Sequence, residues 1–190
     1  MKHALRAALV AVALALAIPS IASAASLSSS DWTLRDSWVN YVKNPLWING
    51  SITASNTWST SDGYTYTVPV SSSSSDVQEH SGQIRFQVPL HGIDITFADL
   101  TVTRVDPDTA VVNAVTSYDP LSGPDVVDEP TDILWLDLTS AGTSSSGGVT
   151  TYTDADAYLT ADGADVFNGG TNGSYDENEE WGDFSVAFSD

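Results

Sequence analysis

The chain has 190 residues, no cysteine, and 25 acidic against six basic residues, which gives a formal net charge of −19 at pH 7. The absence of cysteine excludes disulfides, thiolate metal sites and a lipid-anchored lipoprotein. So acidic a surface repels nucleic acid and anionic membranes, and neither is an expected partner.

The first 24 residues have the pattern of a secretory signal peptide. Lys2 and Arg6 form a positively charged start, and residues 7–18 (AALVAVALALAI) form an apolar segment that is short for a membrane span. The small residues at 22–24 suit a cleavage site. We therefore expect a protein that is secreted or associated with the cell envelope, with no membrane anchor of its own.

Residues 25–190 are enough for a single domain with its own core. Loss of Lys2 and Arg6 leaves four basic residues against 25 acids, a net charge of −21. This charge is typical of a surface that stays soluble in a saline or alkaline exterior. Weak calcium binding by the acidic segments 154–158 (DADAY) and 175–181 (YDENEEW) is a second interpretation.

A short amphipathic helix is predicted at the start of the mature chain. Ser30 is a suitable N-cap, and Asp31 would lie in the first turn, where the helix dipole favours negative charge. Apolar and aromatic residues then recur at helical spacing: Leu34, Trp38, Tyr41 and Val42. Pro45 prevents the helix from continuing beyond Asn44.

The rest of the sequence is dominated by strand patterns. Strands are predicted within the following segments: 51–58, 64–70, 83–105, 110–115, 133–138 and 183–189. The first two should form a hairpin, Gly92 should divide the third, and the turn at 106–109 should pair the third with the fourth.

Two further segments, 117–132 and 139–154, are rich in acids, serine, glycine and proline and are predicted to be loops. A second short helix is predicted within 158–170, capped by Thr160. Together these elements predict a mainly β fold, an antiparallel β-sandwich or barrel-like domain with two short helices.

Motifs of common enzyme chemistry are missing: the sequence has no HExxH and no GxSxG. A tyrosine can bind ferric iron as a phenolate when a neighbouring group stabilises the charge or shares the proton. Tyr41 lies on the predicted helix with Ser37 one turn before it on the same face, and His91 is one of two histidines left in the mature chain. By spacing alone, such a tyrosine is more often a packing residue.

Four segments in order carry a resemblance to a known family. They are Trp32 followed by SWVNY (37–41), GSI (50–52), SGQIRFQVPLHGIDITFADLTV (81–102) and LTADGADVF (159–167). In these segments the chain resembles the HtaA-type haem-binding domain of Gram-positive cell envelopes, over nearly the whole mature length.

The resemblance implies that Tyr41 is the axial ligand of haem iron, that His91 hydrogen-bonds to it, and that Ser37 contacts a propionate. We add Trp38 and Phe167 as aromatic residues of the predicted haem site. The implied function is not enzymatic: the protein would capture ferric haem outside the cell and pass it to, or take it from, proteins of the cell envelope. An acidic extracellular adhesion or structural β-module without a haem ligand is the alternative, and a secreted hydrolase is a third.

Overall fold

The computed structural model describes residues 28–44, 49–55, 57–120, 123–171 and 173–189. The predicted signal peptide, 1–24, lies outside the described residues. The strands are β1 (Ser29–Leu34), β2 (Ser51–Ala54), β3 (Thr65–Ser73), β4 (Val77–His80), β5 (Gln83–Val88), β6 (Ile93–Asp106), β7 (Thr109–Tyr118), β8 (Val126–Asp137), β9 (Gly142–Ser146), β10 (Val149–Leu159) and β11 (Glu180–Ser189). The helices are α1 (Asp36–Val42), α2 (Ala161–Thr171) and a 3-10 turn, η1 (Pro89–His91).

Eight of these strands close into an antiparallel barrel. They pair in the cyclic order β1–β3–β4–β6–β7–β8–β10–β11, and β11 returns to β1. The first half of β6 pairs with β5, and β5 pairs with β2, so these two strands extend one end of the wall beyond the ring. The mainly β, barrel-like domain with two helices is therefore confirmed.

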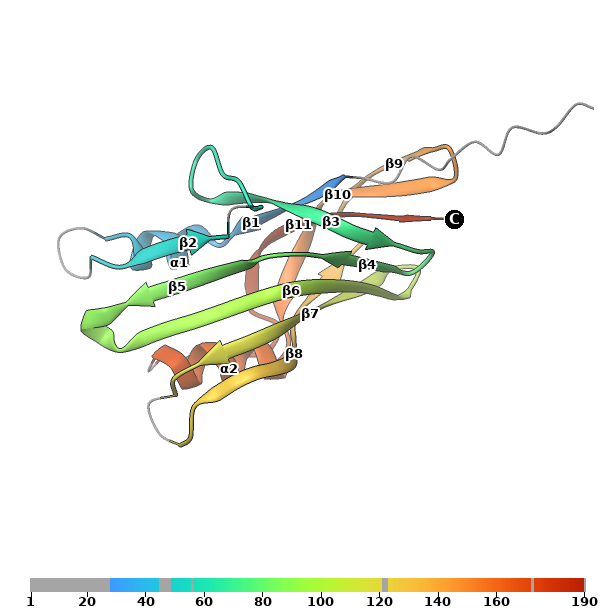
Figure 1. Cartoon of the computed structure of the whole chain (residues 1–190). Coiled ribbons are helices and arrows are strands. Elements are labelled where there is room, and N and C mark those ends of the chain that lie inside the picture. The colour runs from blue at the N-terminus through green and yellow to red at the C-terminus, as the bar shows by residue number, and fades with distance from the viewer. Residues whose placement is uncertain (1–27, 45–48, 56, 121–122, 172, 190) are drawn as a thin grey trace, which may run out of the picture.

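The barrel is filled by every second side chain of its strands. β7 shows the pattern most clearly, because buried and partly exposed residues alternate along nearly its whole length. Three aromatic rings from different strands meet inside: the Trp32 centroid lies 6.3 Å from that of Phe97 and 6.3 Å from that of Phe184. α1 and α2 close one end of this core, and Figure 1 shows both helices near the end of the wall where β5 turns into β6.

The predicted N-terminal helix is wrong over its first residues. Residues 29–34 form strand β1, which pairs with β3 on one side and β11 on the other. Ser30, Trp32 and Leu34 alternate inward, and this period of two was hidden because Ser30 is polar. Only Asp36–Val42 is helical, and its N-cap is Arg35 rather than Ser30.

The predicted hairpin between 51–58 and 64–70 is also wrong. β2 pairs with β5, whereas β3 lies between β1 and β4. Each segment is a strand, but neither its length nor its alternation specifies which distant strand will accept it.

Both predicted loops, 117–132 and 139–154, contain strands. The first half of β8 pairs only with β7, so Pro130 sits at an edge where its missing N–H breaks no ladder on the open side. β9 and β10 form a hairpin around Gly147 and Gly148, which both have positive φ angles, 63° and 77°.

Three other local predictions are confirmed. Gly92 separates β5 from β6 with a left-handed φ of 70°. The backbone N–H of Gly163 donates to Thr160 Oγ1 at 2.8 Å, so Thr160 caps α2 as expected. In β11 the side chains of Phe184, Val186 and Phe188 are buried.

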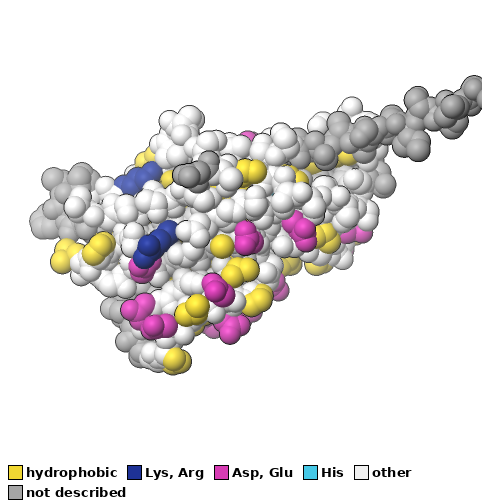
Figure 2. Space-filling model, viewed as in Figure 1, with side chains coloured by type: hydrophobic (Ala, Val, Ile, Leu, Met, Phe, Trp, Pro, Cys, Tyr) yellow, Lys and Arg dark blue, Asp and Glu magenta, His cyan; other side chains and the backbone are white. Residues whose placement is uncertain are grey.

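The outside of the barrel is acidic, as the composition requires. Figure 2 shows one face, on which acidic side chains outnumber basic ones and alternate with small apolar patches. No helix within the described residues is long and apolar enough to cross a membrane.

Candidate functional site

Tyr41 and His91 meet at the end of the barrel closed by α1. Tyr41 lies in the last turn of α1, and His91 is the last residue of η1, between β5 and β6. The two atoms Tyr41 Oη and His91 Nδ1 are 2.6 Å apart, a short hydrogen bond. Tyr41 is half-buried and His91 is exposed, so the pair is accessible from solvent.

The His91 tautomer sets which atom of this pair carries the shared proton. Burial raises the pKa of Tyr41 above its ordinary value, so the phenol is neutral at neutral pH. Its O–H donates to His91 Nδ1 in the imidazole tautomer that carries its proton on Nε2, and its oxygen accepts from Nδ1–H in the other tautomer. In the first tautomer the phenol has an adjacent proton acceptor, and a deprotonated phenol is an anionic oxygen ligand suited to a hard metal ion.

An aromatic cluster supports Tyr41 from beneath. The ring of Trp38 stacks on Tyr41 with centroids 5.8 Å apart, and Trp38 in turn packs edge-on against Phe167 at 5.2 Å. Phe167 also contacts Trp181 at 4.3 Å. Trp38 and Phe167 are 2% and 1% exposed, so they fix the position of Tyr41 and present little surface of their own.

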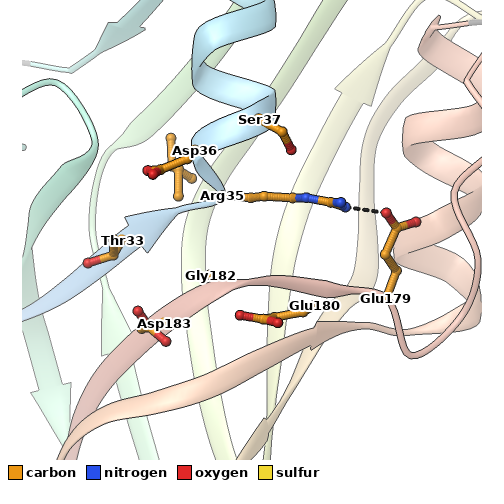
Figure 3. A pocket seen from close by; sticks show the side chains of 9 residues that line it. Thr33, Arg35, Asp36, Ser37, Glu179, Glu180, Gly182 and Asp183 are labelled. Carbon is orange, nitrogen blue, oxygen red and sulfur yellow. Dashed lines mark hydrogen bonds and ion pairs between the residues drawn. The ribbon is translucent and has the colours of Figure 1, made fainter.

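Ser37 faces a pocket on the same helix. This pocket has a volume of about 600 Å³ and lies where β1 leads into α1 and where the chain enters β11; its lining includes Arg35, Ser37, Glu179 and Asp183. Figure 3 shows the Arg35 side chain crossing it to an ion pair with Glu179, with Ser37 on the neighbouring turn of α1. Neither Tyr41 nor His91 lines this pocket, so the pocket and the Tyr41–His91 pair are two separate parts of the surface, with Ser37 one turn before Tyr41.

Tyr175 lies between these two parts and was not predicted from the sequence. Its ring is 6.4 Å from Trp38 and 5.0 Å from Trp181, measured between centroids. Burial is the main cause that raises the pKa of Tyr175; Tyr41 and Glu179 raise it further, whereas Arg35 lowers it. The pKa of Tyr175 therefore responds to charges at Tyr41 and at the Arg35–Glu179 pair.

Arg35, Glu179 and the exposed Leu90 were also missed. Arg35 could have been singled out, since it is one of four basic residues after the signal peptide and stands two positions before Ser37. Leu90, 71% exposed and adjacent to His91, offers apolar surface beside the pair. Glu179 carries no local signal, because acids are common throughout the chain.

The other histidine of the mature chain is structural. His80 is buried in the barrel wall, with Nδ1 3.2 Å from the carbonyl oxygen of Leu100 and Nε2 2.9 Å from Ser30 Oγ. Burial lowers the pKa of His80 to about 4, so it is neutral at neutral pH. Within the described part of the chain, no three His, Asp or Glu side chains converge to hold a metal ion by themselves.

Comparison with known proteins identifies the family. The Htaa family model matches residues 28–187, which is most of the chain. The chain belongs to the HtaA family. A comparison with curated proteins found no significant match.

Solved structures share the fold of this HtaA-family chain. The C-terminal domain of HtaA from Corynebacterium glutamicum superposes with a TM-score of 0.70 at 17% identity, over 85% of this chain and 94% of that domain. The heme-binding protein HtaB from the same organism gives a TM-score of 0.64 at 17% identity, over 85% and 92%. The N-terminal domain of HtaA gives 0.62 at 19% identity, over 85% and 95%.

Proposed function

We propose that this protein is a secreted, non-enzymatic binding protein that captures ferric haem through the Tyr41 phenolate and relays it to other proteins of the cell envelope. The observation that carries the proposal is the 2.6 Å hydrogen bond between Tyr41 Oη and His91 Nδ1. A tyrosine with a dedicated proton acceptor on an exposed surface is unusual for a packing residue, and it is a recognised type of axial haem ligand. The fold relationship to a protein described as heme-binding, HtaB, supports the same proposal.

The residues present suit the group they would hold. Tyr41 supplies an oxygen donor, and the exposed Leu90 supplies apolar contact beside it. Ser37, one turn before Tyr41, supplies a hydroxyl for a propionate. The buried Trp38 and Phe167 keep the Tyr41 ring fixed, which lowers the ordering cost of binding. Haem itself would supply the ferric iron that this oxygen binds.

Binding and release would be coupled to one proton. If Tyr41 becomes a ligand, its proton would pass to His91 Nδ1, and the resulting imidazolium would stabilise the phenolate. Protons from solvent would compete with the iron for the phenolate oxygen, so acidification would favour release. Binding that depends on a single, solvent-accessible oxygen suits transfer by direct contact with a second protein.

A visible spectrum tests the proposal. Hemin is added to the purified mature protein, to Tyr41→Phe and to the control Tyr158→Phe, whose phenol is on β10. We expect wild type and Tyr158→Phe to give the same Soret band and the same weak charge-transfer band in the red. Tyr41→Phe should lose the charge-transfer band and shift the Soret band.

Identical spectra for wild type and Tyr41→Phe would contradict the haem proposal. They would favour the alternative of an acidic extracellular adhesion or structural module. A folded wild-type protein whose spectrum shows no bound hemin would also contradict the haem proposal.

A further inference from the structure

We infer that Arg35 is a second anchor of the binding site, which holds one carboxylate of the ligand, and that Glu179 occupies Arg35 until that carboxylate replaces it. This inference rests on the proposed haem-binding function. It adds an exchangeable ion pair that would set how tightly, and how selectively, a porphyrin carrying free carboxylates is held.

Arg35 is held in place independently of its acidic partner. Its guanidinium lies over the ring of Trp181, with Cζ 5.5 Å from the centroid, and its backbone N–H donates to the Trp181 carbonyl at 3.2 Å. Trp181 is buried, so this platform is rigid. The guanidinium would therefore stay near its position if Glu179 moved away.

The ion pair with Glu179 is the kind that a ligand can displace. The two side chains are 34% and 28% exposed, and within the described chain Glu179 accepts one hydrogen bond from the Arg35 guanidinium, at Nη1. A partly exposed pair of this type contributes little stability, so its exchange costs little.

The other basic side chains are committed elsewhere. Arg85 donates from both Nε and Nη2 to Asp94, and Arg104 donates to Asp76 and to the Ser75 carbonyl. The Lys43 ammonium donates to the carbonyl oxygen of Gly63. Of the four, Arg35 is the one that lines the pocket beside Ser37.

Ser37 links the pocket of Arg35 to Tyr41. Ser37 lines the pocket together with Arg35, and it lies one turn before Tyr41 on the same face of α1. The pKa of Tyr175 responds to the charges of both Tyr41 and Arg35. We therefore expect one ligand to reach both Arg35 and Tyr41.

The acids around the pocket explain why Glu179 must leave. Asp36, Glu180 and Asp183 also line it, and burial together with the neighbouring acids Asp156, Asp154 and Glu180 raises the pKa of Asp183. With so much negative charge, Arg35 can hold one carboxylate at a time. An incoming ligand carboxylate therefore exchanges for Glu179, and the return of Glu179 promotes release.

Two charge-neutral variants and two probes test the exchange. Arg35→Gln and Glu179→Gln are titrated with hemin and with hemin dimethyl ester, whose carboxylates are blocked, and Kd and dissociation rate are measured spectrophotometrically. We expect Arg35→Gln to raise the Kd for hemin by about tenfold and Glu179→Gln to lower it by a few-fold, on the scale of a charge-assisted hydrogen bond. Neither change should alter the Kd for the ester. Arg85→Gln, which breaks an ion pair outside the pocket, is the matched control and should bind both probes like wild type.

The outcomes separate this inference from the proposed function. If neither Arg35→Gln nor Glu179→Gln changes hemin binding by more than about twofold while the Tyr41-dependent spectrum persists, the exchange is wrong and the haem proposal stands. Weaker binding of the ester by Arg35→Gln would also overturn it, because Arg35 would then act through the fold. If Arg35→Gln does not fold, as judged by circular dichroism, the Glu179→Gln variant tests the exchange alone, because its Kd for hemin should decrease. Loss of the Tyr41 dependence itself contradicts the haem proposal.

Discussion

At the scale of single residues, the Tyr41–His91 pair would couple the proposed metal ligand to a proton. The pair joins positions 50 residues apart in the chain. Burial alone would keep Tyr41 neutral and a poor ligand, since it raises the pKa of the phenol. In the proposed site, His91 would offset that penalty by accepting the proton, so the contribution of His91 to hemin binding should depend on pH.

Replacement of His91 by alanine should weaken hemin binding, most strongly near neutral pH. We expect a loss on the order of tenfold to a hundredfold, the value of a hydrogen bond to a charged group. The difference in affinity from wild type should narrow as pH rises, because the phenol loses its proton to solvent more readily at higher pH. Hemin titrations between pH 6 and 10 measure this.

The conservative variant His91→Gln provides the control for that experiment. Its side-chain carbonyl can still accept the hydrogen bond of Tyr41 but cannot take up the proton. The His91→Gln variant should therefore bind hemin more tightly than His91→Ala, and its affinity should still depend on pH. A constant gap between wild type and His91→Ala at every pH would show that His91 acts only through packing.

At the scale of elements, both helices depend on the barrel for their existence. α1 has seven residues, too few for a stable isolated helix, and is held by the burial of Trp38, Val39 and Val42. α2 lies close against β8, and Gly163 makes that approach possible: a Cβ at this position would overlap the carbonyl oxygen of Ile133. The position of α2 on β8 in turn brings Phe167 into contact with Trp38.

Gly163→Ala should destabilise the protein even though alanine is the better helix former. Alanine gains about 1 kcal/mol in helix propensity, but overpacking against the backbone of β8 costs more. We expect a net loss of about 2 kcal/mol in the free energy of unfolding, measured by urea denaturation. Asp165→Ala, at an exposed position of the same helix, is the control and should change stability little. Equal stability of Gly163→Ala and wild type would mean that α2 can shift freely on β8.

At the scale of the whole molecule, the acidic surface and the buried His80 both bear on stability at low pH. The folded protein keeps His80 neutral, because burial lowers its pKa to about 4 from the ordinary value of 6.5. The unfolded chain binds this proton from about pH 6.5 downward, whereas the folded chain does not. His80 therefore has no effect on the pH dependence of stability above pH 7, and it lowers the free energy of unfolding as pH decreases from about 6.5 to about 4.

The free energy of unfolding should decrease by about 3 kcal/mol from this one group between pH 7 and pH 4. Urea denaturation at pH 7.5, 6.0 and 5.0 measures the slope, and most carboxylates have yet to titrate in that range. His80→Gln should be less stable at pH 7.5, where the hydrogen bonds of His80 are lost, yet show a flatter dependence on pH. Parallel slopes for wild type and His80→Gln would exclude His80 as the cause.

Much of the fold class was determined by the sequence itself, through local alternation. Successive side chains of β6, β7 and β11 point to opposite faces, so Gly92, the turn at 106–109 and the last strand could be recognised from short windows. Thr160 capped the second helix by the same local logic. The HtaA motifs likewise placed Tyr41, Ser37 and His91 on predicted elements before any distance was known.

Tertiary structure decided what local patterns cannot encode. β1 was mistaken for helix because Ser30 faces inward, and a buried serine is acceptable only where Gln78 and His80, from a strand nearly fifty residues later, hydrogen-bond it. The partners of β2 and β3 were decided by the closure of the barrel. The 2.6 Å approach of Tyr41 to His91, and the pairing of Arg35 with Glu179 across 144 residues, follow from that closure, because only the folded ring brings these chain segments to one end.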